Sequence, residues 1–185
     1  MMLITSQPPS VRLPRRHGFI HALNLAVREA RDDGQPLSVV VVEIDPARDG
    51  PSQAHHAELW SRVGQVLRLA SGRSGVLAHV GDGVFAVLRR HTPVRQACEL
   101  AERLRVAIEV QFAARKHPMT ASVGVACGPV PGDGDGTALF DAAQRRCRDA
   151  RAEGGNRVVC GPTDPWQDPP HATASFVPRA AARAR

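Results

Sequence analysis

Residues 79–88 read His-Val-Gly-Asp-Gly-Val-Phe-Ala-Val-Leu, with a Gly-Asp-Gly turn between two apolar, β-prone segments. An Asp-Gly pair in this setting is a strong local signal for a tight β-hairpin, because its turn needs residues that tolerate a positive φ. Glycine turns also let the backbone approach phosphate groups closely. The stretch therefore predicts a hairpin with arms 76–80 and 84–88, which is either plain turn chemistry or part of a nucleotide site.

Helical and strand patterns alternate on both sides of this hairpin. The continuous β-branched run 37–44 predicts a central strand that is covered on both faces. Thr92-Pro93 predicts a helix start, with Thr92 as the N-cap and Pro93 at the first helical position. The further expected strands are 119–127 and 156–160, and the expected helices are 13–31, 57–70, 92–108 and 137–153. The fold class is α/β, with a central mixed β-sheet flanked by helices, close to the ferredoxin-like plan.

The length of 185 residues and a hydrophobic content of 43% predict one domain with a real core. We expect a flexible leader over 1–11, a folded domain over 12–160 and a disordered Pro/Ala/Arg-rich tail over 161–185. No apolar run has the length of a membrane span, and the N-terminus does not resemble a signal peptide. These features predict a cytoplasmic protein that does not enter a membrane.

The formal net charge of +6 comes mainly from arginines that are scattered along the chain, since Lys116 is the only lysine. The chain has no tyrosine and few other aromatic residues, so a base-stacking platform for nucleic acid is not expected. The charge still favours anionic ligands, including nucleotides.

Four cysteines are widely spaced and contain no CxxC pair: Cys98, Cys127, Cys147 and Cys160. We interpret them as reduced, mostly buried thiols of a cytoplasmic protein and not as a zinc site.

Two carboxylates, Glu43 and Asp45, follow each other at the end of the central strand. Side chains two residues apart on a strand point to the same side. Together with phosphate oxygens they would suit Mg²⁺; alternatively, they are two solvated acids at a strand end.

Several strings in this order resemble the GGDEF domain, the catalytic module of bacterial diguanylate cyclases. The resemblance covers residues 13–159. It rests on Leu13-Pro14 with Arg16 and Phe19, on Glu43-Ile44-Asp45, on 81–85, on Thr120–Val125, on 139–143 and on 152–159. It implies a fold like that of the nucleotide-cyclase palm, and a dimer that condenses two GTP molecules into cyclic di-GMP with the help of metal ions.

The chain departs from the family pattern at the positions that carry this chemistry. Glu43 stands where the family has an aspartate and is one methylene longer. Ala47 and Arg48 replace a Phe and a Lys, and the guanine-reading Asn and Asp have no clear counterparts between residues 49 and 58. The regulatory RxxD motif is absent, since 72–75 read Gly-Arg-Ser-Gly, so product inhibition there is not expected.

The signature itself keeps only Gly81 and Phe85. Asp82 stands where phosphate would pass over a glycine, Gly83 removes a metal ligand and Val84 removes the following acid. A slip of the turn by one residue would make Asp82 a metal ligand. That slip would turn Phe85 out of the core unless a bulge absorbed it.

By the same resemblance, Arg151 stands in for a phosphate-contacting lysine, and Gly155 replaces an arginine. The implied nucleotide-binding candidates are Arg48, Gly81 and Arg151, and the vestigial metal ligands are Glu43, Asp45 and Asp82. Mg²⁺ is expected only if nucleotide binding is retained.

These departures lead to three hypotheses. The first is a degenerate GGDEF domain without cyclase activity, which acts as a regulatory or protein-interaction module with another protein or a second copy as partner. The second is a receptor for GTP or cyclic di-GMP without turnover. The third is a residual cyclase that uses Glu43, Asp45 and Asp82.

Overall fold

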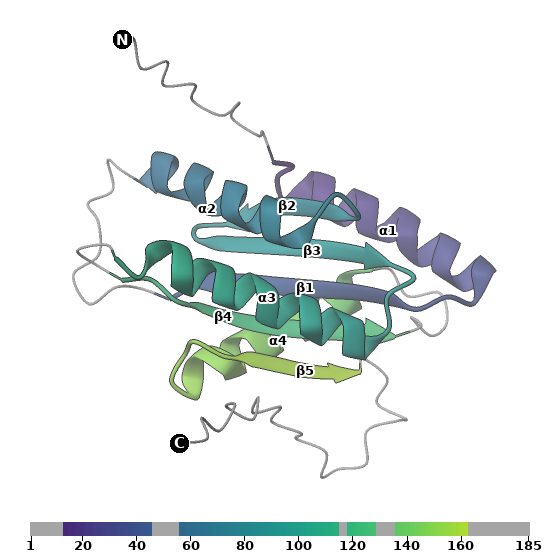
Figure 1. Cartoon of the computed structure of the whole chain (residues 1–185). Coiled ribbons are helices and arrows are strands. Elements are labelled where there is room, and N and C mark those ends of the chain that lie inside the picture. The colour runs from purple at the N-terminus through teal and green to yellow at the C-terminus, as the bar shows by residue number, and fades with distance from the viewer. Residues whose placement is uncertain (1–12, 46–55, 115–117, 129–135, 163–185) are drawn as a thin grey trace.

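The computed structural model describes residues 13–45, 56–114, 118–128 and 136–162 (Figure 1). The expected leader lies outside this part of the chain, as does the expected tail from residue 163 on. The helices and strands of the described residues are, in chain order, α1 (Arg16–Asp33), β1 (Leu37–Ile44), α2 (His56–Ser71), β2 (Val76–Gly81), β3 (Val84–Arg90), α3 (Val94–Phe112), β4 (Ala121–Gly128), α4 (Thr137–Ala152) and β5 (Val158–Pro162).

The five strands form one mixed sheet in the order β2-β3-β1-β4-β5. β1 is central and pairs antiparallel with both β3 and β4, whereas β4 pairs parallel with β5. The parallel pair is joined through α4, as a parallel connection requires a crossover. The α/β class and the mixed central sheet expected from the sequence are confirmed.

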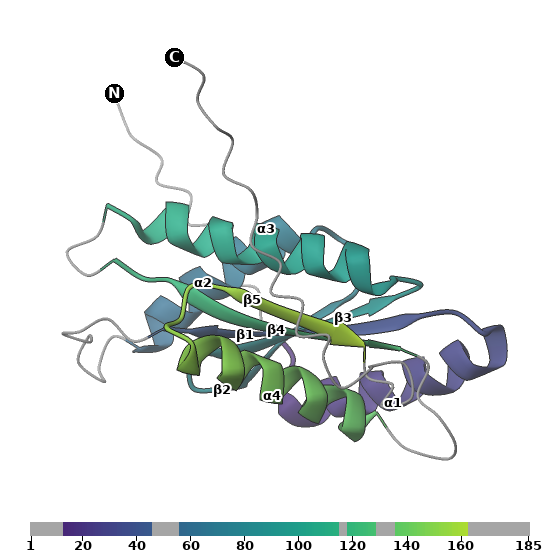
Figure 2. The ribbon, with the colours of Figure 1, turned by 90° about the horizontal axis from the view of Figure 1, so that it is seen from below.

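Helices cover both faces of the sheet (Figures 1 and 2). Val40 and Val42 of β1 face the core under α2 and α3, while Val39 and Val41 face the core under α1 and α4. Because the strand is covered on both sides, alternation of polar and apolar residues is absent from its sequence. Polar side chains occur at the end of β1, where the two cores stop and burial is incomplete.

The hairpin forms as expected and keeps the register that buries its aromatic anchor. Phe85 and Val87 are fully buried in the core under α2 and α3. The pairing of β2 with β3 shifts between His79 and Gly81, so a bulge lies just before the turn. The bulge leaves Phe85 inside.

Most element boundaries differ from the expected ones by one to four residues, and the start of α3 and the end of β5 have a local cause. Thr92 is not the N-cap of α3: Pro93 occupies that position, and the Thr92 hydroxyl donates to the carbonyl of Arg90 at 2.8 Å. β5 continues to Pro162, two residues beyond its expected end, because Gly161 and Pro162 pair with β4. No helix in the described ranges has the length and apolar character needed to cross a membrane.

The expectation of four reduced cysteines is wrong for one pair. Cys98 on α3 and Cys160 on β5 form a disulfide, with their Cα atoms 6.1 Å apart. The parallel pairing of β5 with β4 brings Cys160 under α3, a proximity that sequence spacing cannot reveal. Cys127 and Cys147 are buried thiols that take no part in the disulfide, and burial raises the pKa of both, that of Cys147 to about 12. Both are therefore poor nucleophiles at neutral pH.

Replacing Cys98 with serine is expected to lower the free energy of unfolding of the oxidised protein by about 4 kcal/mol. The reason is that the bond closes a 62-residue separation, which restricts the unfolded chain. Denaturant unfolding with and without reductant measures this. The difference between wild type and Cys98→Ser should vanish in reductant. Four titratable thiols in unreduced, denatured wild type would contradict the bond.

Candidate functional site

The turn of the hairpin is covered by a tryptophan from α2. The indole N–H of Trp60 donates to Oδ1 of Asp82 at 2.8 Å. The same ring lies over Gly83, where an added Cβ would come within 3.1 Å of it. Gly83 has a φ of 66° and is buried, while its carbonyl accepts the N–H of Ile44 at 3.0 Å. Glycine is required here both for the turn and for the approach of the indole.

Trp60 is the residue of this site that the sequence reasoning missed. At its place in α2 a large apolar residue fits the helical periodicity, so the pattern does not mark it. Its ring lies 6.5 Å from that of His79, which in turn stacks on Phe85 at 4.7 Å. The side chains of α2 and the hairpin thus form one packed unit around the turn.

Glu43 forms an ion pair with Arg151 on α4. The candidate metal ligand and the candidate phosphate-binding cation of the sequence analysis therefore meet, and each neutralises the other. The pair is partly exposed, with 21% of the Glu43 side chain and 46% of the Arg151 side chain accessible. An exposed pair of this kind adds little to stability, but it occupies both groups.

Asp45 is held by three hydrogen bonds. Its Oδ1 accepts from the Ser122 hydroxyl at 2.7 Å, and its Oδ2 accepts from the Thr120 hydroxyl at 2.7 Å and from the backbone N–H of Asn156 at 3.0 Å. The carboxylate thereby joins the end of β1, the start of β4 and the turn between α4 and β5. Charge-assisted bonds of this type are stronger than neutral ones.

The turn between α4 and β5 is shaped to receive Asp45. Gly154, Gly155 and Asn156 all have a positive φ, of 113°, 72° and 48°. A Cβ on Gly155 would lie 3.2 Å from the carboxyl carbon of Asp45. Gly155, which the resemblance aligns with an arginine, thus lets the turn close against this carboxylate.

The side chain of Asn156 extends the contact to α3. Its Oδ1 accepts from Arg105 at 2.6 Å, and its Nδ2 donates to Glu109 at 2.9 Å. The bond from Asn156 and that from Arg105 lower the pKa of Glu109, while Glu102 and Glu109 raise the pKa of Arg105. The turn between α4 and β5 is therefore bonded both to Asp45, at the end of β1, and to α3.

The three candidate metal ligands do not gather at one point. Glu43 pairs with Arg151 of α4, whereas Asp82 accepts a hydrogen bond from Trp60 of α2. These two helices cover opposite faces of the sheet. Asp45 bonds to the start of β4 and to the turn between α4 and β5. Among the described residues, no group of three or more His, Cys, Asp or Glu side chains could hold a metal ion. This arrangement does not fit Mg²⁺. Arg48 lies outside the described residues, so its role stays a prediction. Nucleotide binding at Gly81 also stays a prediction.

Comparison with known proteins identifies the fold. A family model described as "Diguanylate cyclase, GGDEF domain" matches residues 10–157. The GGDEF domain of FimX from Pseudomonas aeruginosa is 23% identical with a TM-score of 0.67, covering 84% of this chain and 99% of that one. The active GGEEF domain of a diguanylate cyclase from Vibrio cholerae is 21% identical with a TM-score of 0.68, covering 83% and 99%.

A third similar structure is diguanylate cyclase SiaD in complex with its activator SiaC from Pseudomonas aeruginosa. It is 18% identical with a TM-score of 0.64, and the match covers 84% of this chain and 61% of that one. The search of curated proteins gave no match. The fold is that of the cyclase palm-like domains, and the chain belongs to the GGDEF family, as the resemblance in the sequence implied.

Replacing Asp45 with asparagine is expected to lower the free energy of unfolding by about 2–4 kcal/mol. The substitution removes the negative charge, and it places an NH₂ group where the carboxylate oxygen accepts hydrogen bonds from neighbouring donors. Asp82→Asn is the matched control, because Asp82 is exposed and accepts one bond; its cost should be about 1 kcal/mol or less. Urea unfolding measures both. Equal losses in the two variants would contradict the joining role of Asp45.

The stability of the protein is also expected to depend on His79. Burial, and after it the charge of Arg15, lowers the pKa of this imidazole, against smaller opposing effects of Asp82 and Gly81. The unfolded state then binds a proton at a higher pH than the folded state does. This contribution to stability is complete above about pH 6.5 and is lost as the pH falls toward the lowered pKa.

Unfolding midpoints measured in urea between pH 7.5 and pH 5 test this dependence. Wild type should lose stability on acidification. His79→Phe keeps a ring against Phe85 and should show a shallower decline over the same range. An identical decline in both proteins would exclude His79 as its source.

Proposed function

We propose that this GGDEF domain has lost diguanylate cyclase activity and acts as a regulatory or protein-interaction module in bacterial signalling that involves cyclic di-GMP. The observation that carries the proposal is the engagement of every candidate catalytic carboxylate within the chain. Glu43 pairs with Arg151, Asp45 accepts three hydrogen bonds and Asp82 accepts the Trp60 indole N–H.

Phosphoryl transfer of this kind depends on metal ions that organise the phosphates and activate the attacking hydroxyl. A carboxylate can be recruited to a metal only if it leaves its present partners. For Asp45 that would open the joint between β1, β4 and the α4–β5 turn. Gly83 offers no ligand where the family signature has an acid, so release of Glu43 alone would not complete a metal site.

The hairpin is also poorly suited to phosphate. Asp82 puts a negative charge on the turn, and the Trp60 ring covers Gly83. A phosphate group that approached the turn would meet a carboxylate in place of a bare glycine backbone, and like charges repel. These features support a domain that kept the fold and uses its surface for recognition.

One protein that contains this fold has a protein partner. Diguanylate cyclase SiaD has been solved in complex with its activator SiaC, so a domain with this fold occurs in a protein that binds a regulatory protein. We infer that this chain binds another protein or a second copy of itself. Its surface, and not a reaction, would then carry the signal.

The retained-receptor alternative rests on Gly81, which is exposed beside the turn. Calorimetry with GTP and with cyclic di-GMP separates it from the first proposal. Heat of binding without turnover would favour the receptor, while no heat at high micromolar protein would leave the interaction module.

A turnover assay tests the proposal. The purified chain is incubated with GTP and Mg²⁺, and chromatography with mass spectrometry is expected to detect no cyclic di-GMP. The active Vibrio cholerae GGEEF domain, assayed in parallel, serves as the positive control and defines the detection limit. Product from wild type that disappears in Asp82→Asn would contradict the proposal and favour the residual cyclase.

A further inference from the structure

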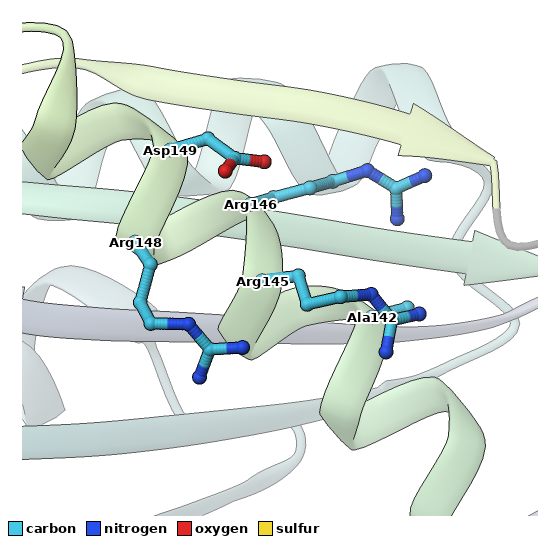
Figure 3. A pocket seen from close by; sticks show the side chains of 5 residues that line it. All are labelled: Ala142, Arg145, Arg146, Arg148 and Asp149. Carbon is cyan, nitrogen blue, oxygen red and sulfur yellow. The ribbon is translucent and has the colours of Figure 1, made fainter.

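A hollow lined mainly by arginines lies along α4, away from the hairpin. It has a volume of about 350 Å³ and is lined by Ala142, Arg145, Arg146, Arg148 and Asp149 (Figure 3). Neither the signature residues nor the carboxylates of β1 take part in it. None of the hypotheses about cyclase chemistry assigns it a role.

The arginines of this hollow differ in how they are held. Arg146 is half-buried and extends alongside β5, where a Cβ on Gly161 would come within 2.7 Å of its Nε (Figure 3). The absence of a side chain at Gly161 makes room for this guanidinium against the strand. The position of Arg146 is therefore set by the packing of α4 on the sheet and not by solvent.

Arg145 and Arg148 are exposed and project from α4 into the same hollow (Figure 3). Within the described ranges, neither forms an ion pair. This distinguishes them from Arg151, one turn further along, whose charge is matched by Glu43. Two guanidinium groups thus face solvent without a carboxylate partner among these residues.

The charges in the hollow define the ligand that would suit it. Three guanidinium groups and the Asp149 carboxylate give a formal net charge of +2 (three minus one). A phosphate monoester carries close to two negative charges at neutral pH. Guanidinium groups bind phosphate oxygens through paired, charge-assisted hydrogen bonds. Mutual repulsion of the exposed Arg145 and Arg148 guanidinium groups is relieved when such an anion sits between them.

We propose that this hollow is a binding site for the phosphate group of a small phosphorylated molecule. Arg145 and Arg148 would supply the exposed contacts, and Arg146, held against Gly161, would form the fixed wall. The proposal does not depend on the loss of cyclase activity, because its residues lie outside the hairpin and the end of β1. A positive turnover assay would leave it standing.

Titration of the ¹⁵N-labelled full chain with inorganic pyrophosphate, at constant ionic strength set with NaCl, tests the site. Saturable amide shifts are expected to concentrate on 142–149 and 158–162. Arg145→Ala combined with Arg148→Ala should weaken binding at least tenfold. The matched control combines Arg28→Ala with Arg62→Ala, which removes the same charge from exposed positions on α1 and α2 and should change affinity less than twofold.

Two further variants probe the geometry. Gly161→Ala should displace the Arg146 guanidinium and weaken binding while the net charge stays constant. Asp149→Asn should strengthen binding of the anion, because it removes a negative charge from the rim. Shifts without saturation, equal losses in the arginine pair and its control, or an unchanged affinity in Gly161→Ala would each overturn the proposal.

Discussion

The central strand β1 is buried on both faces, and this imposes a constraint on every polar group near its end. Glu43 and Asp45 lie where the two cores stop, half-buried, and a carboxylate there must find partners. Asp45 finds them in Ser122, Thr120 and the N–H of Asn156. These bonds tie the end of β1 to the start of β4 and to the turn from α4 into β5.

The same constraint involves several positions at which the sequence analysis expects departures from the family pattern. Gly155 leaves room for the Asp45 carboxylate, and Asn156 carries the contact on to Arg105 and Glu109 of α3. On the other side, Trp60 closes over the turn and takes up Asp82. Positions that the family resemblance assigns to metal and nucleotide binding are here engaged by other groups of the chain, and the proposed loss of turnover rests on this engagement.

Much of the fold could be predicted from the sequence, because it depends on local patterns. The apolar run 37–44 predicts a central strand, and Asp82-Gly83 between β-prone arms predicts the hairpin. The cap at Thr92 was misplaced by one residue, since Pro93 satisfies the same local geometry. These signals lie within a few residues of the structure that they predict.

The rest of the site could not be predicted, because it depends on contacts between distant segments. Asp45 bonds to residues 75 and 77 positions away, and Cys98 meets Cys160 only after β5 has paired with β4. Trp60 fits the apolar face of a helix, so nothing in its spacing marks the bond to Asp82. Spacing marked Glu43 and Asp45 as candidates, and the family resemblance added Asp82 and Arg151. Neither could reveal that each of these side chains has a partner within the chain.

Titration of the ¹⁵N-labelled chain with Mn²⁺ is the most direct measurement of whether these carboxylates are available to a metal. Bound Mn²⁺ broadens the amide signals around its site, and it suits the oxygen ligands that hold Mg²⁺. If Glu43, Asp45 and Asp82 remain engaged, no broadening confined to residues 43–45 and 81–83 should occur at micromolar Mn²⁺. Selective broadening of those two segments together would show that the three carboxylates converge on a metal, and would contradict the account.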